Sequence, residues 1–194
     1  MSAVKWLNFF RRRPPEVSWL IVGLGNPGSE YVDTRHNVGF AAVDTLVDEL
    51  RPQPRVNAEG AIVGKALAVK PLTYMNASGE AVAPLARRLG VAPENIVVIH
   101  DELDLPEGAI KIKRGGNENG HNGLKSLTAE LGTRDYIRIR VGIGRPPKGV
   151  SVPDYVLDRS ENDQTQTINT AAEAARLVTT EGLERAQHKI HSKR

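Results

Sequence analysis

The chain has 194 residues, no cysteine and a formal net charge of +3. Its length fits one domain whose core is large enough to fold without disulfides or a metal ion. The lack of cysteine excludes disulfides, thiolate catalysis and cysteine-ligated zinc or iron–sulfur centres, and it is compatible with a reducing cytoplasm. Because no apolar run approaches the ~20 residues that cross a bilayer, we expect a cytoplasmic protein without a membrane span.

The first 18 residues are predicted to form a flexible N-terminal extension. Aromatic residues at positions 6, 9 and 10 come before three arginines and the pair Pro14-Pro15. This order is the reverse of a signal peptide, in which the basic residues precede the apolar ones. Contact of this segment with a membrane surface is the alternative. The folded domain is expected over residues 19–194.

The first half of the domain reads as strands and helices in alternation. Residues 19–22 are a short apolar run closed by glycine, which predicts a buried strand. Apolar residues at 43, 46, 47 and 50 have helical spacing and predict an amphipathic helix over residues 38–50, ended by the prolines at 52 and 54. Strands are predicted over 61–64 and 66–70, and a helix over 78–89 with Gly90 as its C-cap.

The second half continues the same alternation. Residues 95–99 are apolar on both faces, as a central parallel strand requires, and further strands are predicted over 109–113 and 136–141. Helices are predicted over 123–131 and 161–181, with one or two further turns after Gly182. This order of elements predicts an α/β fold: a single three-layer domain with a mixed, mostly parallel sheet flanked by helices.

Short polar segments follow several of the apolar runs. They are GLGNPG (23–28), TRHN (34–37), TYMN (73–76), HDELD (100–104) and GHNG (120–123). Because the carboxyl ends of strands form the ligand crevice of an open α/β sheet, these segments are expected to meet there. A polar site assembled from distant segments favours an enzyme.

Two of the segments allow more than one interpretation. Residues 23–28 satisfy the dinucleotide pattern GxGxxG, but turn residues stand where a helix would begin, and no acidic residue closes a second strand about 20 positions later. The alternative is that this turn presents the Asn26 amide. Likewise Asp101, Glu102 and Asp104 could hold Mg²⁺, although no DxDxDG loop or HExxH motif accompanies them.

His36 and Asp101 are the candidate catalytic pair. A carboxylate that accepts a hydrogen bond from one imidazole nitrogen fixes the tautomer, so that the other nitrogen can take a proton from water. Cysteine is absent and no GxSxG motif supports a serine nucleophile. Water is therefore the expected nucleophile, and a capping or surface role for His36 is the alternative.

Positive charge gathers between positions 109 and 148. This stretch has nine Lys or Arg residues against three acidic ones, a local balance of +6. It includes Lys111, Lys113 and Arg114, which precede the polar loop 115–123, whose free N–H groups favour phosphate or carbonyl oxygens. The charge indicates an anionic partner, with nucleic acid the first candidate, and a solvated basic face is the alternative.

Together, these segments resemble bacterial peptidyl-tRNA hydrolases. The motifs that carry the resemblance are GLGNPG (23–28), YxxTRHNxG (31–39), TYMNxSG (73–79), HDELDLP (100–106) and GHNGLK (120–125), and the match covers about residues 19–191. The resemblance implies a monomeric α/β esterase that needs neither metal nor cofactor. It implies peptidyl-tRNA as the partner, without a stable protein partner, and hydrolysis of the ester between the peptide and the tRNA 3′ end, which releases the tRNA for reuse.

The resemblance also implies a role for each matching residue. His36 is similar to the family's catalytic base and Asp101 to its orienting partner. The amides that hold the peptide and steady the water correspond to Asn26 and Asn76. The remaining matches are Asn122 for orientation of the tRNA 3′ end, Tyr31 and Met75 for the crevice lining, and Lys113 and Arg140, with Lys111 nearby, for a clamp on tRNA phosphate.

The chain departs from the family pattern in the loop before His121. Asn117, Glu118 and Asn119 stand where the family usually has more glycine. A Glu118 carboxylate near bound phosphate is expected to weaken tRNA binding or change loop closure. The alternative function is therefore a catalytically weak RNA-binding paralogue with the same fold.

Overall fold

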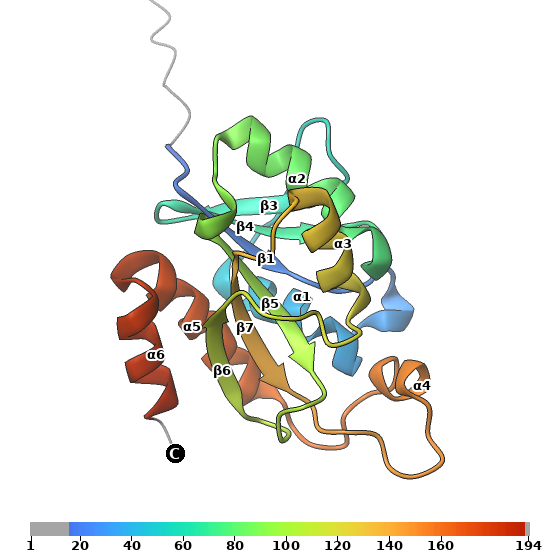
Figure 1. The fold of residues 1–194 in the computed structure, drawn as a ribbon. Helices are drawn as coiled ribbons and strands as arrows, with labels where there is room; N and C mark the ends of the chain where they lie inside the picture. Colours follow the sequence, from blue (N-terminus) through green and yellow to red (C-terminus); the bar gives the residue numbers. More distant parts are fainter. Residues whose placement is uncertain (1–15, 193–194) are drawn as a thin grey trace, which may run out of the picture.

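The computed structural model describes residues 16–192, which form a seven-stranded sheet with helices on both faces (Figure 1). The strand order is β2-β3-β4-β1-β5-β7-β6. β4, β1, β5 and β7 in the centre are parallel, whereas β2, β3 and β6 run antiparallel to their neighbours. The strands are β1 (Trp19–Gly23), β2 (Arg51–Pro52), β3 (Ala58–Val63), β4 (Ala66–Pro71), β5 (Ile96–Glu102), β6 (Ile110–Arg114) and β7 (Ile137–Gly142). The mixed, mostly parallel sheet of the prediction is confirmed.

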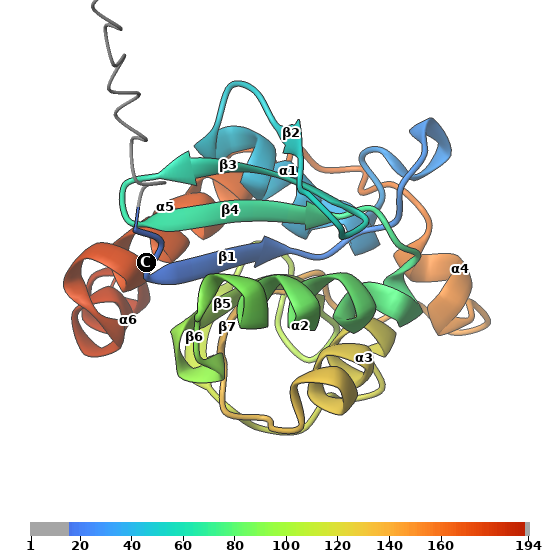
Figure 2. The same ribbon diagram turned by 90° about the horizontal axis from the view of Figure 1, so that it is seen from above.

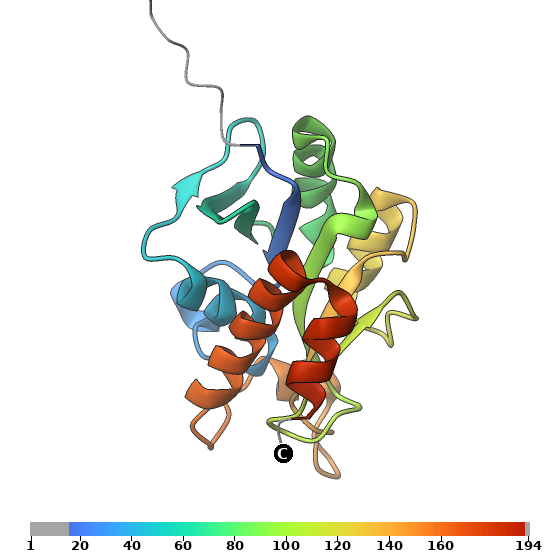
Figure 3. The ribbon, with the colours of Figure 1, turned by 90° about the vertical axis from the view of Figure 1, so that its left-hand side faces the viewer.

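The helices form two layers, with the sheet between them (Figure 2). One face carries α1 (Val38–Leu46), α5 (Thr165–Glu181) and α6 (Leu183–His191), and Figure 3 shows α5 and α6 against each other in front of the sheet. The other face carries α2 (Ser78–Leu89) and α3 (Asn122–Leu131). A short helix, α4 (Val152–Val156), lies to the side, beyond the carboxyl ends of the central strands.

The core lies on both faces of the central strands. All seven residues of β5 are buried, including the polar ones at its end. Alternate residues point to opposite sides, so that Ile21 and Val97 pack under α1 and α5, while Leu20 and Val98 pack under α2. Central parallel strands covered on both faces must be apolar throughout, which explains their recognisable sequence.

Two predicted helices have different ends in the structure. The helix predicted over 38–50 ends at Leu46, because Val47 is extended (φ −142°, ψ 144°) and the following chain must reach the edge strand β2. Val47 and Leu50 still pack against the core, so their apolar character was misread as a longer helix. The helix predicted over 161–181 begins at Thr165, whose N–H donates to the Asp163 carboxylate at 2.9 Å.

Glycine allows β1 to end directly against α1. A Cβ on Gly23 would lie 2.1 Å from the Gly39 carbonyl oxygen, and a Cβ on Gly25 would lie 2.6 Å from the Phe40 ring. The GxGxxG pattern therefore serves close packing, and its turn runs on to a helix that begins only at Val38. This contact brings residues 24–26 beside residues 36–37.

No helix among residues 16–192 is long and apolar enough to cross a membrane. Most of the predicted N-terminal extension, residues 1–15, lies outside the described part of the chain.

Candidate active site

A cavity of about 560 Å³ lies beyond the carboxyl ends of β1, β4 and β5. Its floor is polar, and α4 supplies an apolar wall that includes Val152 and Val156. The polar segments of the sequence meet here, as expected for the edge where parallel strands end. Six predicted site residues line it: Asn26, His36, Met75, Asn76, Asp101 and Asn122.

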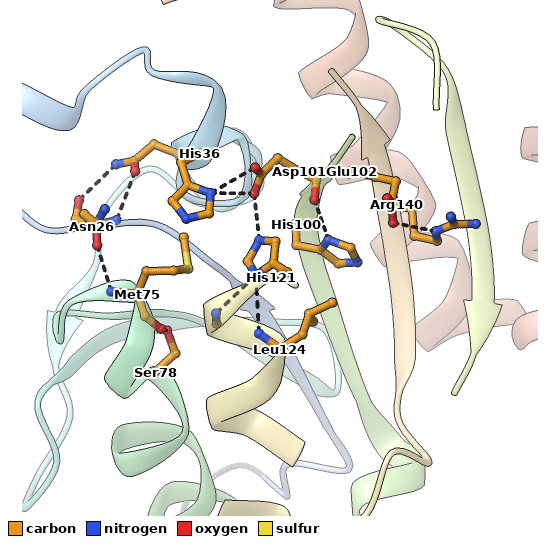
Figure 4. Close-up of polar contacts among 12 residues, drawn as sticks. Asn26, His36, Met75, Ser78, His100, Asp101, Glu102, His121, Leu124 and Arg140 are labelled. Atoms are coloured by element: carbon orange, nitrogen blue, oxygen red, sulfur yellow. Dashed lines mark hydrogen bonds and ion pairs between the residues drawn. The ribbon is translucent and has the colours of Figure 1, made fainter. Parts of the chain in front are cut away.

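His36 and Asp101 are in direct contact, although 65 positions separate them in the chain. His36 lies in a 3₁₀ turn (Arg35–Asn37) just before α1, and Asp101 lies near the end of β5. The Nδ1 atom of His36 is 2.9 and 3.0 Å from the two carboxylate oxygens of Asp101 (Figure 4). Their side chains are 12% and 3% exposed, so the pair is shielded from bulk water while His36 still reaches the cavity.

A second imidazole shares the same carboxylate. The Nε2 atom of His121 is 2.8 Å from Oδ1 of Asp101. Its Nδ1 accepts the backbone N–H groups of Gly123 and Leu124 at 3.1 and 3.3 Å, which caps α3 (Figure 4). Because Nδ1 is an acceptor, the proton of neutral His121 lies on Nε2 and is donated to Asp101.

These contacts keep Asp101 ionised. Burial by itself would raise the pKa of the Asp101 carboxyl, but the charges and hydrogen bonds of His36 and His121 outweigh burial and hold the pKa well below its usual range. Asp101 is therefore a permanent acceptor that orients both imidazoles.

A third imidazole, His100, lies behind this pair and carries no charge. It is 1% exposed, and its Nδ1 donates to the Asp101 backbone carbonyl at 2.7 Å. Burial, reinforced by the nearby His121, lowers the pKa of His100 from 6.5 to about 3. At neutral pH His100 is thus a neutral packing partner of the site.

The Asn26 side chain is held by the backbone around it. Its Oδ1 accepts the Met75 N–H at 2.7 Å, at the start of a 3₁₀ turn (Met75–Ala77). The buried Asn37 side chain accepts the Asn26 N–H and donates to the Asn26 carbonyl, both at 2.9 Å. Because Oδ1 is occupied, Asn26 offers the cavity its Nδ2 donor.

The acidic residues do not converge on a common point. Asp101 contacts the two histidines, Glu102 accepts from Arg140, and Asp104 accepts from Arg145. His36, Asp101 and His121 have the ligand types for a metal ion, with their ligand atoms within 4.8 Å of one another. They would bind one only if both histidine–carboxylate hydrogen bonds were broken, since a metal needs each ligand atom at about 2.0–2.2 Å.

Comparison with known proteins identifies the family. A sequence model of the peptidyl-tRNA hydrolase family matches residues 20–194. The chain belongs to the peptidyl-tRNA hydrolase family. It is 52% identical over its whole length to the whole of a Corynebacterium glutamicum protein named peptidyl-tRNA hydrolase 2. It is 46% identical to a Mycobacterium tuberculosis peptidyl-tRNA hydrolase, over 89% of this chain and 97% of that protein. The crystal structure of peptidyl-tRNA hydrolase from Acinetobacter baumannii is 34% identical, with a TM-score of 0.82 over 93% of this chain and 97% of that one.

The remaining residues that the family resemblance singled out lie in two other places. Tyr31 is half-buried in a 3₁₀ turn (Ser29–Tyr31) and is not among the residues that line the cavity. Lys111 and Lys113 lie on β6, directly opposite Arg140 and Arg138 on β7. These four cations therefore share one face of the two-stranded ribbon.

The unusual acidic residue of this family member's loop is neutralised. Both oxygens of the Glu118 carboxylate accept from Arg134, at 2.7 and 3.2 Å, and the Glu118 side chain is 12% exposed. Hydrogen bonds from Arg134 lower the pKa of Glu118 to about 2. The carboxylate is present as the sequence indicated, but its charge is balanced, which removes the reason to expect a weak paralogue.

Sequence reasoning missed two residues that organise the site, Asn37 and His121. Both lie inside the polar segments that were recognised, next to residues that were given roles. The missing signal was the identity of their partners: Asn37 bonds the backbone of Asn26, and His121 bonds Asp101. The local hint that the sequence offers for His121 is its place in the polar segment 120–123, directly before a predicted helix.

Proposed function

We propose that this protein hydrolyses the ester that joins a peptide to the 3′ end of tRNA, with His36 as the base that activates water. Membership of the peptidyl-tRNA hydrolase family supports the reaction. The observation that carries the role of His36 is its contact with Asp101 through Nδ1 only. Its Nε2 has no hydrogen-bond partner among residues 16–192, and the side chain lines the cavity.

The hydrogen bonds distinguish the two histidines. Both nitrogens of His121 are in use, one with Asp101 and the other with the first turn of α3. His36 has one nitrogen in use and one free. Only His36 can therefore accept a proton from water without losing an existing hydrogen bond, and we assign His121 to the support of Asp101.

The reaction follows from this arrangement. Asp101 accepts the Nδ1 proton of neutral His36, so the Nε2 lone pair faces the cavity and takes a proton from a bound water. The water oxygen attacks the ester carbonyl carbon, and the carbonyl oxygen becomes an oxyanion. When this intermediate collapses, the bond to the ribose 3′ oxygen breaks, and Nε2 of His36 returns the proton to that oxygen. The products are a tRNA with a free 3′ hydroxyl and a peptide carboxylic acid, which releases its proton to solvent and becomes a carboxylate.

Three asparagine side chains hold the substrate in this scheme. Asn26 offers its Nδ2 to the peptide or to the oxyanion, because its Oδ1 is held by Met75. Asn76 and Asn122 are exposed and line the cavity on either side, where they can bind the peptide and the tRNA 3′ end. Neutral amides bind carbonyl and hydroxyl groups without adding charge beside His36.

The basic face of β6 and β7 is assigned to the tRNA backbone. Lys111 is exposed and lies opposite Arg140 in the ladder, with Lys113 two residues along. Arg140 donates its Nε to Glu102 at 3.0 Å, which holds its guanidinium in place, and Glu102 in turn lines the cavity. This pair links the phosphate-binding face to the active site. Tyr31 stays a proposed crevice residue on the family resemblance alone, since it is not among the residues that line the cavity.

We further propose that residues 19–194 act as a monomeric catalytic unit in the cytoplasm without a cofactor or metal. The single chain supports this, since residues of one copy complete the site. The chemistry described needs only water and the side chains named.

The decisive experiment is release of free tRNA from N-acetyl-aminoacyl-tRNA, with unblocked aminoacyl-tRNA alongside. The wild type should cleave the blocked ester only, and His36→Ala should lower kcat by about 100-fold or more, since a positioned base contributes at least that factor. His188→Ala, an exposed histidine on α6, is the matched control and should retain activity. Equal rates for His36→Ala and the wild type would refute the assignment.

A further inference from the structure

Arg138 is a buried cation that the proposed reaction does not use. It lies on β7, is 1% exposed and stacks on the Tyr136 ring, with its guanidinium carbon 4.7 Å from the ring centroid. It forms no ion pair with a carboxylate of residues 16–192, and its Nε has no hydrogen-bond partner there. Burial lowers the pKa of Arg138.

Such a group is costly to keep. Moving a cation out of water is strongly unfavourable unless close partners replace the lost hydration. The partners of Arg138 are two backbone carbonyls of one loop: Nη1 donates to Asn117 at 2.6 Å and Nη2 to Gly116 at 2.7 Å. A neutral side chain would fill the same space at lower cost, so the charge is retained for what it does to this loop.

The loop joins the basic face to the active site. It follows β6 directly, and residues 118–122 line the cavity. Gly115, Gly116, Asn119 and Gly120 have positive φ angles of 66°, 105°, 49° and 78°. Glycine and asparagine tolerate this region, so the sequence permits this conformation among others and fixed contacts select it. The bonds from Arg138 turn the carbonyls of the loop inward at its start.

The opposite side of the loop backbone is left without protein partners. The N–H groups of Asn117, Asn119 and Gly120 donate to no acceptor among residues 16–192. N–H groups of successive residues in such turns form concavities that bind anions. The Glu118 carboxylate within the same loop is balanced by Arg134, so it leaves the loop free to accept a phosphate.

We propose that Arg138 is a positioning residue, which holds the loop 115–121 in the conformation that presents its free N–H groups and Asn122 to a phosphate near the 3′ end of the substrate. This rests on the proposed function. Arg138 does not touch the substrate itself, because it is enclosed under the loop. It keeps the loop 115–121 in its phosphate-binding conformation before the substrate arrives.

The test compares Arg138→Met and Arg138→Lys with the wild type. Methionine removes the charge, and lysine keeps it but cannot donate to both carbonyls in the same fork. Arg51→Met removes an exposed charge at the opposite edge of the sheet and serves as the control. We would measure kcat, KM and the salt dependence of KM, together with amide exchange of Gly115 and His121, whose N–H groups close the loop on Tyr136 and Glu118.

Arg138→Met should raise KM about tenfold with little change in kcat, as expected if the loop is competent only about one time in ten without its anchor. Arg138→Lys should raise KM less, and exchange at His121 should accelerate in both. The salt slope should not change, whereas Lys113→Ala, which removes a direct phosphate contact, should lower it by about 0.7. Arg51→Met should behave as the wild type.

An unchanged KM in folded Arg138→Met would overturn the proposal. A slope lowered as in Lys113→Ala would also overturn it, because Arg138 would then be a direct phosphate contact. If Arg138→Met does not fold, Arg138→Lys decides the matter by the same measures. If the wild type does not cleave peptidyl-tRNA, the proposed function is refuted. The role of Arg138 is tested separately, and unchanged amide exchange at Gly115 and His121 in the Arg138 variants would refute it.

Discussion

Protonation of the buried His100 should limit the stability of this protein in mild acid. The pKa of His100 is 6.5 in the unfolded chain and about 3 in the folded protein, because burial disfavours the imidazolium. As the pH falls below 6.5, the unfolded state takes up this proton first. Stability is therefore full above pH 6.5 and is lost progressively as the pH falls towards 3.

The size of this effect follows from the two pKa values. At pH 7.5 His100 is neutral in both the folded and the unfolded protein, so its protonation lowers the free energy of unfolding by less than about 0.1 kcal/mol. At pH 5 the unfolded chain is almost fully protonated and the folded protein is not, which lowers the free energy of unfolding by about 2 kcal/mol. For a chain of this size, 2 kcal/mol corresponds to a fall of roughly 4–8 °C in Tm.

The assay is the free energy of unfolding from pH 7.5 to 5 for the wild type and His100→Phe. Phenylalanine keeps a ring beside His121 but cannot titrate, and its loss of the bond to the Asp101 carbonyl shifts stability equally at every pH. His191, whose pKa is lowered by burial and by Lys111, contributes to both proteins and cancels in the difference. Between pH 7.5 and 5, the free energy of unfolding of His100→Phe should fall by about 2 kcal/mol less than that of the wild type. Parallel pH profiles would refute the reasoning.

Two further predictions concern the polar contacts of the site. Asp101→Asn should lower kcat by about 10³-fold or more and leave KM nearly unchanged, because an amide can donate to Nδ1 of His36 and so favour the wrong tautomer; steady-state kinetics on N-acetyl-aminoacyl-tRNA would contradict this if KM rose while kcat held. Asn37→Ala leaves the Asn26 N–H and carbonyl unpaired in a buried position, which should cost about 2–4 kcal/mol and lower Tm by on the order of 10 °C. Asn37→Asp retains the acceptor and should lose less in the same thermal melt, so equal losses for the two variants would count against the hydrogen-bond explanation.

The sequence by itself determined most of the elements and where the site would form, but it did not predict β2 or α4. The apolar run of β5 and the glycine after α2 are local signals: the first reflects burial on both faces, and the second reflects the left-handed conformation of Gly90 (φ 67°). Three of the five polar segments indicated the cavity for a similar reason, since they follow the parallel strands β1, β4 and β5, which end at one edge. The segments 34–37 and 120–123 reach the cavity through loops, and the strand before the second of them, β6, is antiparallel. Each of these signals is contained within a few neighbouring residues.

Helix ends were less well determined. Val47 and Leu50 have the spacing of a helix, yet the chain there is extended because it must pair at the sheet edge. The spacing of apolar residues shows which side chains face the core. A helix and an extended segment that pack on the same surface can have the same spacing. Only the position of the neighbouring strand decides between them.

The roles within the site depended on tertiary structure. His36 and His121 are equivalent in sequence as polar residues before a helix, and they differ only in which ring nitrogens have partners. The balance of the Glu118 charge by Arg134, and the burial of Arg138 under the loop, are likewise set by distances between segments. The position of a histidine proton and the charge balance of a carboxylate depend on partner atoms within about 3 Å. Those partners lie 16 to 65 positions away in the chain, so only the packing of distant segments decides which atoms they are.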